Sequence, residues 1–100
     1  MSNAIVVRYR TRPEATADNE ALVRAVYDEL AGSSPDGFHY MTLKLDDGVS
    51  FVHVAVHDDG APNPLAASPA FARFQADLAS RLDEGPTPAP AQVVGRYAFP

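Results

Sequence analysis

Residues 37–60, GFHYMTLKLDDGVSFVHVAVHDDG, contain two runs of alternating apolar and polar residues on either side of Asp47-Gly48. This pattern is typical of a β-hairpin, because side chains of a strand alternate between two faces and Asp-Gly favours a tight turn. A two-residue turn at Asp47-Gly48 places residue 43 opposite residue 52. A three-residue loop at residues 46–48 is the alternative, and it would exchange the faces of one strand relative to the other.

The two-residue turn is preferred because it gives the hairpin one aliphatic face and one aromatic, more polar face. The aliphatic face contains Met41, Leu43, Leu45, Val52, Val54 and Val56. The aromatic face contains Phe38, Tyr40, Thr42, Lys44, Phe51, His53, Ala55 and His57. Since the aromatic face is too apolar for open water and too polar for an ordinary core, we expect any functional site to lie there.

The rest of the sequence predicts two helices and two further strands. Residues 5–10 form a β-branched run, and residues 15–31 repeat apolar residues at helical spacing before Gly32. Two prolines suppress regular structure in the loop 61–67. Next to it, Ser68 is suited to cap a second helix that ends near Gly85.

Three prolines between residues 86 and 90 predict an extended connector before a last strand at residues 92–99. The order β-α-β-β-α-β predicts an α+β fold, the ferredoxin-like sandwich, as one domain that includes residues 1–100. We expect the sheet order 4-1-3-2, with strands one and three side by side and parallel and both helices on one face.

We expect the helices to cover the aliphatic face, so that the other face exposes a large apolar patch that includes Phe38, Tyr40, Phe51 and Ala55. Monomeric proteins rarely leave such a patch in water. We therefore expect a homodimer in which a second copy of the sheet covers this face.

Composition argues against several classes of protein. A formal charge of −5 without a basic stripe argues against nucleic-acid binding, including an RNA-binding sheet of this topology. The absence of cysteine excludes a thiolate site and is compatible with the cytoplasm, and no apolar run approaches the roughly 20 residues of a membrane helix. No metal site is expected, because the backbones of His53 and His57 lie roughly 13 Å apart along one strand.

Several segments resemble the antibiotic-biosynthesis-monooxygenase-like proteins of the dimeric α+β barrel superfamily. They are Asp47-Gly48 followed by Phe51-Val52-His53, Asn63-Pro64-Leu65, Pro69-Ala70-Phe71 with Phe74, and Val94-Gly95-Arg96-Tyr97. The resemblance implies the fold and a homodimer. Relatives include cofactor-free monooxygenases of aromatic polyketides and haem-degrading enzymes that use a helix-borne His with a Trp and an Asn. This chain has no Trp and no His in either predicted helix, which argues against haem degradation and weakens the oxygenase hypothesis.

The first functional hypothesis is a binding or purely structural module. Phe38, Tyr40, Phe51 and His53 would line a cavity in each subunit and hold a small aromatic or amphipathic molecule, without a cofactor. The alternative is a cofactor-independent monooxygenase acting on a phenolic or polyketide-like substrate. In that hypothesis His53 removes a proton from the substrate, Tyr40 positions it and Arg96 stabilises the anion.

Each candidate also has a structural explanation. His53 would form a hydrogen bond with Thr42, its partner in the preferred register, and the sequence favours this interpretation. Tyr40 suits a dimer interface equally well, and Arg96 more often pairs with a carboxylate at the rim. Asn19, near the start of the first helix, is expected to bond to the backbone rather than to a ligand.

Overall fold

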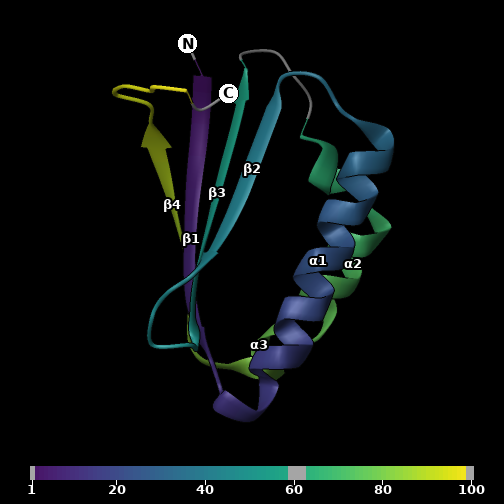
Figure 1. The fold of residues 1–100 in the computed structure, drawn as a ribbon, viewed down its shortest axis with the longest axis vertical. Coiled ribbons are helices and arrows are strands. Elements are labelled where there is room, and N and C mark those ends of the chain that lie inside the picture. The colour runs from purple at the N-terminus through teal and green to yellow at the C-terminus, as the bar shows by residue number, and fades with distance from the viewer. Residues whose placement is uncertain (1, 59–62, 99–100) are drawn as a thin grey trace.

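The computed structural model describes residues 2–58 and 63–98 and consists of a sheet with helices on one side (Figure 1). Its elements are β1 (Ser2–Thr11), η1 (Pro13–Ala15), α1 (Thr16–Ser33), β2 (Phe38–Lys44), β3 (Ser50–Asp58), η2 (Pro64–Ala67), α2 (Pro69–Ala76), α3 (Leu78–Arg81) and β4 (Leu82–Gln92). The predicted α+β class and the ferredoxin-like arrangement are confirmed. Part of the predicted loop 61–67 lies outside the described residues. None of the described helices has the length and hydrophobicity needed to cross a membrane.

The four strands are ordered β2-β3-β1-β4, which confirms the predicted neighbours. All three neighbouring pairs are antiparallel, so the prediction that strands one and three run parallel was wrong. Each helical crossover joins two parallel strands, β1 to β2 and β3 to β4, and a strand of the other unit lies between them. Neighbours in the sheet therefore run in opposite directions.

The preferred hairpin register is also confirmed, because Leu43 lies opposite Val52. The turn is longer than predicted. The amide of Gly48 donates to the carbonyl of Leu45 at 3.0 Å, so the central residues of the β-turn are 46 and 47. Gly48 follows with a φ of +79°, a conformation that glycine adopts without strain.

The side chain of Asp47 holds this longer loop in place. Its Oδ1 accepts hydrogen bonds from the amides of Val49 and Ser50, at 2.9 and 2.8 Å. The side-chain bond from Ser50 and these two amides lower the pKa of the Asp47 carboxyl. The loop therefore keeps the register that a two-residue turn would give.

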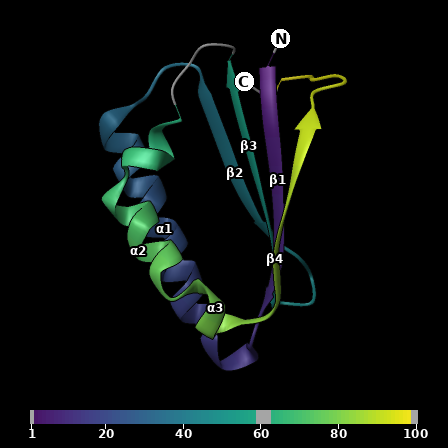
Figure 2. The same ribbon diagram turned by 180° about the vertical axis from the view of Figure 1, so that it is seen from behind.

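The helices cover the aromatic face of the hairpin, whereas the sequence predicted that they cover the aliphatic face (Figures 1 and 2). Phe51 is 2% exposed and His53 is 5% exposed, whereas Leu43 on the other face is 43% exposed. Aromatic side chains are long enough to fill the space between sheet and helices, and their polar atoms bond to one another there. The core consists of Tyr9, Val23, Val26, Phe38, Phe51, Ala55, Leu65, Ala70, Phe74 and Leu82.

The second helical segment begins as predicted but ends early. The amide of Phe71 donates to the Ser68 hydroxyl at 3.0 Å, which confirms the predicted cap. The helix is interrupted at Asp77, and α3 ends at Arg81 rather than near Gly85. The amide of Arg12 donates to the Arg81 carbonyl at 2.8 Å, so the chain joins the sheet directly after α3.

The last strand also differs from the prediction. β4 ends at Gln92, so it includes the predicted proline connector and almost none of the predicted strand at 92–99. Pro88 lies opposite Val7, and Thr87 lies opposite Arg8. Only alternate residues of an antiparallel strand bond to one neighbour, and the prolines occupy the other positions. Because β4 is an edge strand, those prolines cost no ladder bond and hinder pairing with a further strand.

Candidate functional site

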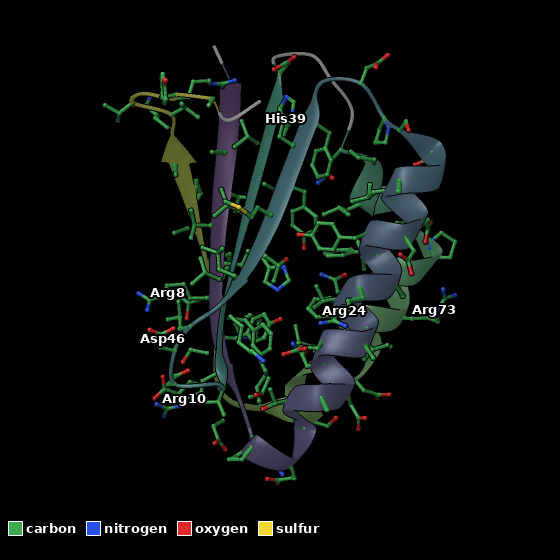
Figure 3. All side chains as sticks on the ribbon, viewed as in Figure 1. Arg8, Arg10, Arg24, His39, Asp46 and Arg73 are labelled. Atoms are coloured by element: carbon green, nitrogen blue, oxygen red, sulfur yellow. The ribbon has the colours of Figure 1, made fainter. Side chains whose placement is uncertain are left out.

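A cavity of about 420 Å³ lies between the sheet and the α2 side of the helical layer. Figure 3 shows side chains from both layers converging in the space between sheet and helices. The sheet contributes Tyr9, Tyr40 and His53 to the cavity wall, and the helical side contributes Leu65, Phe71 and Phe74. None of the described residues that line it is charged. A mostly apolar cavity of this size with a few polar groups suits a small organic molecule.

His53 is the centre of the polar groups in this cavity. Its Nε2 lies 2.7 Å from the Tyr9 hydroxyl, and its Nδ1 lies 2.6 Å from the Tyr40 hydroxyl and 3.2 Å from Thr42 Oγ1. β3 lies between β1 and β2, so a side chain on its inner face has a neighbour on either side. The alternation of the strands places all of these side chains on the helix-facing side.

Two residues outside the cavity wall extend the hydrogen-bond network behind Tyr9. Asn19 of α1 is fully buried, and its Nδ2 donates to the Tyr9 hydroxyl at 2.9 Å. Arg81 of α3 is 7% exposed, and its Nε donates to Asn19 Oδ1 at 3.1 Å. Arg81 also donates from Nη2 to the carbonyl of Phe74 at 2.6 Å, and its guanidinium lies 5.4 Å from the centre of that ring.

A second branch runs from His53 towards α1. Thr42 Oγ1 lies 2.7 Å from the Tyr27 hydroxyl. The rings of Tyr27 and Tyr40 stack with their centres 5.1 Å apart. The network therefore links three strands and two helices through side chains, which fixes the positions of both cavity tyrosines.

Burial determines the charge states in the network. It lowers the pKa of His53 to about 4, so the imidazole is neutral at neutral pH. Burial raises the pKa of Tyr9 to about 12, although the Asn19 hydrogen bond and the charge of Arg81 oppose the rise. Burial also raises the pKa of Tyr40, and there the neighbouring Tyr27 adds to the effect. The cavity therefore presents neutral hydroxyl and imidazole groups.

The predicted site residues fall into two groups. Tyr40 and His53 line the cavity. Phe38 and Phe51 lie on the same face of the sheet, but they contribute to the core and to two smaller grooves along α1. Arg96 lies beyond β4 and does not line the cavity.

The predicted hydrogen bond between His53 and Thr42 is present. The expectation for Asn19 was wrong, because its side chain bonds to Tyr9 and Arg81 rather than to the backbone. Arg81 was not singled out from the sequence. A signal was present, since Arg81 follows Phe74 by seven residues and so belongs to the apolar side of the predicted helix.

The fold and the cavity define an α+β protein of the ferredoxin-like type with a partly open site between sheet and helices. No protein-family model and no curated protein matches the sequence. Solved structures do match in fold, and they confirm the resemblance to the antibiotic-biosynthesis-monooxygenase-like proteins.

Three solved structures illustrate this resemblance. Rv0793 from Mycobacterium tuberculosis is 18% identical with a TM-score of 0.74, over 98% of this chain and 100% of that one. SnoaB, a cofactor-independent oxygenase from Streptomyces nogalater, is 20% identical with a TM-score of 0.71, over 97% of both chains. An antibiotic biosynthesis monooxygenase is 17% identical with a TM-score of 0.67, over 95% of this chain and 100% of that one. At these identities the comparison establishes the fold.

Proposed function

We propose that this protein binds a small, planar, mostly apolar molecule in the cavity between the sheet and α2. The observation that carries the proposal is the cavity itself, which is uncharged and apolar except for a few groups such as Tyr9, Tyr40 and His53. Aromatic walls such as Phe71 and Phe74 favour a flat ligand, and the hydroxyl groups provide directional bonds to it.

A cofactor-independent monooxygenase is the second candidate, and the fold of SnoaB is the observation that favours it. His53 lies in the cavity, as that mechanism requires of its base. Two features favour binding over this reaction. Both ring nitrogens of His53 already have hydrogen-bond partners, and a pKa of about 4 makes the imidazole a weak base.

The binding proposal predicts that filling the mouth of the cavity abolishes ligand uptake. Ala72 of α2 is exposed and lines the cavity, so Ala72→Trp should weaken binding of a hydroxylated anthrone by roughly tenfold or more. Binding is measured by calorimetric titration. Ala76→Trp is the matched control, because Ala76 is exposed on the same helix and does not line the cavity. Equal binding by both variants, or no binding by the unaltered protein, would contradict the proposal.

Oxygen consumption with the same anthrone separates the two candidate functions. A binding module takes up the anthrone without accelerating its oxidation. Oxygen uptake above the spontaneous rate that disappears in His53→Ala would instead support the monooxygenase and the role of His53 as base.

We also propose that the protein is a homodimer formed through the open face of the sheet. Met41, Leu43 and Leu45 are the exposed large side chains of this face, and the half-buried Val52 and Val54 lie beside them. Arg8 of β1 lies on the same face, opposite Val52. An aliphatic surface of this kind on an antiparallel sheet can pack against its own copy across a twofold axis. The predicted sheet-to-sheet contact is thus retained, but the aliphatic face forms it.

The dimer proposal predicts that a charge at the centre of this face separates the subunits. Leu43→Asp should raise the dimer dissociation constant at least about tenfold, because the carboxylate would lose its water among the aliphatic side chains of the contact. Light scattering after size-exclusion chromatography measures the mass over a concentration series. Ala21→Asp, on the exposed surface of α1, is the control. A monomeric unaltered protein at micromolar concentration would refute the dimer.

A further inference from the structure

A neutral histidine that contacts two tyrosines can donate a hydrogen bond to one of them and accept one from the other. The imidazole of His53 has one nitrogen that donates and one that accepts, and a tyrosine hydroxyl touches each of them. Only one of the two phenols can therefore donate to the ring. The other phenol accepts a hydrogen bond from the ring, and its own hydroxyl hydrogen can bond to another partner.

The contacts behind Tyr9 decide between the two directions. The Arg81 guanidinium can only donate, so its contact with Asn19 fixes the oxygen of the Asn19 amide towards Arg81. The amide nitrogen of Asn19 must then point to Tyr9 and donate to it. A hydroxyl that accepts a hydrogen bond becomes a better donor, and the nearby positive charge increases the effect. A hydrogen bond with Thr42 likewise lowers the pKa of Tyr40, but of the two phenols Tyr9 is the one on which the charge of Arg81 also acts.

Tyr9 is therefore the stronger donor, and its hydroxyl donates a hydrogen bond to His53 Nε2. The ring then carries its own proton on Nδ1 and donates it towards Tyr40 and Thr42. The Tyr40 hydroxyl proton is left free to bond outside the ring. Because Tyr40 lines the cavity, its hydroxyl can donate a hydrogen bond to a ligand. The Thr42 hydroxyl is the competing acceptor for this hydrogen bond.

We propose that Arg81 and Asn19 are positioning residues that hold His53 in its Nδ1–H tautomer and thereby make Tyr40 the hydrogen-bond donor to the ligand. This inference rests on the proposed function for its ligand, and it narrows the ligand class. The ligand carries a hydrogen-bond acceptor, a carbonyl or phenolate oxygen, on the side that faces Tyr40. In the opposite tautomer Tyr40 would donate a hydrogen bond to the ring, and Tyr9 would be the hydrogen-bond donor to the ligand.

Asn19→Asp tests the direction of the network with almost no change of shape. The new carboxylate accepts from Arg81 and also from Tyr9, so the Tyr9 proton no longer reaches His53. In the unaltered protein we expect the Nδ1–H tautomer to exceed the Nε2–H tautomer by roughly tenfold or more. In Asn19→Asp we expect the Nε2–H tautomer to be the major one. Nitrogen-15 NMR of histidine-labelled protein at neutral pH reads the protonation of each ring nitrogen. His53→Gln assigns the signals by their loss.

Removing the positive charge of Arg81 should weaken the preference of His53 for the Nδ1–H tautomer. Arg81→Met leaves Asn19 free to turn, so both tautomers become populated, whereas Arg73→Met leaves the ratio unchanged because Arg73 is exposed on α2. An Nε2–H tautomer in the unaltered protein would overturn the proposal. So would an unchanged ratio in Asn19→Asp, provided that the variant keeps the unaltered protein's circular dichroism spectrum.

A separate binding experiment tests whether Tyr40 is the hydrogen-bond donor to the ligand. Tyr40→Phe should weaken binding of the hydroxylated anthrone more than Tyr9→Phe does, because the anthrone carbonyl accepts from Tyr40. The reverse order would refute the role given to Tyr40. Because the NMR measurement needs no ligand, failure of the anthrone to bind at all would refute the proposed function and leave the tautomer result standing.

Discussion

Replacing Phe74 with alanine should lower the free energy of unfolding by about 3–5 kcal/mol. Phe74 is 4% exposed, and its ring lies 5.5 Å from the His53 ring and 6.2 Å from that of Tyr9, centre to centre. The variant loses these contacts and the cation–π contact with Arg81, and it enlarges a cavity that already exists. A domain of this size has a total stability of about 5–15 kcal/mol, so the loss is a large part of the total. Urea unfolding followed by circular dichroism measures it.

Phe71→Ala is the matched control for this prediction. Phe71 is on the same helix and touches Phe74 with ring centres 5.8 Å apart, but it is only half-buried. We expect a loss of about 1 kcal/mol. Equal losses in the two variants would show that the helical layer packs on the sheet less tightly than this structure indicates.

The second large effect is a loss of stability in mild acid caused by His53. Burial lowers its pKa from 6.5 to about 4 in the folded protein. Between these values the unfolded chain binds a proton that the folded protein does not, so stability falls as the pH falls. The shift corresponds to about 3 kcal/mol, which is fully present above pH 6.5 and is lost by about pH 4. Urea unfolding at a series of pH values measures this slope.

His53→Gln isolates the contribution of this histidine. The difference in unfolding free energy between the unaltered protein and the variant should shrink by about 3 kcal/mol from pH 7 to pH 4. The lowered pKa of Asp47 affects both proteins equally and cancels in the difference. His39→Gln, on the opposite face of the sheet, controls for the loss of a histidine elsewhere. A difference that stays constant with pH would mean that His53 is accessible to protons in the folded state.

The local pattern was sufficient for the hairpin, the register and the order of elements. Alternation with a period of two determines which residues share a face, and turn residues determine where strands and helices end. The pairing of Thr42 with His53 follows from this arithmetic. So does the presence of Tyr40 and His53 on one face, and these are the predicted site residues that line the cavity.

The same arithmetic cannot say which face the helices cover. Both faces of this hairpin are apolar enough to be buried, so the sequence pattern left the choice open and the prediction chose wrongly. The aromatic face packs against the helices because its polar atoms find partners on other elements, in Tyr27 of α1 for Thr42 and in Tyr9 of β1 for His53. Those partners are far away in sequence, so no local pattern indicates them.

The prolines of β4 also show what the local sequence indicates and what only the tertiary structure decides. Their spacing is visible in the sequence, and it was interpreted as a connector because proline removes a backbone donor. The predicted sheet order already put the last strand at an edge. Only the structure shows that the proline segment itself forms this edge strand, where alternate donors are not needed.

The sequence by itself therefore determined the hairpin, the order of strands and helices and the faces of the hairpin, because these depend on neighbours along the chain. The tertiary structure decided which face became the core and brought Arg81, Asn19 and Tyr9 behind His53. Burial energy and hydrogen-bond satisfaction depend on distant residues meeting in space, and that meeting is a property of the whole fold.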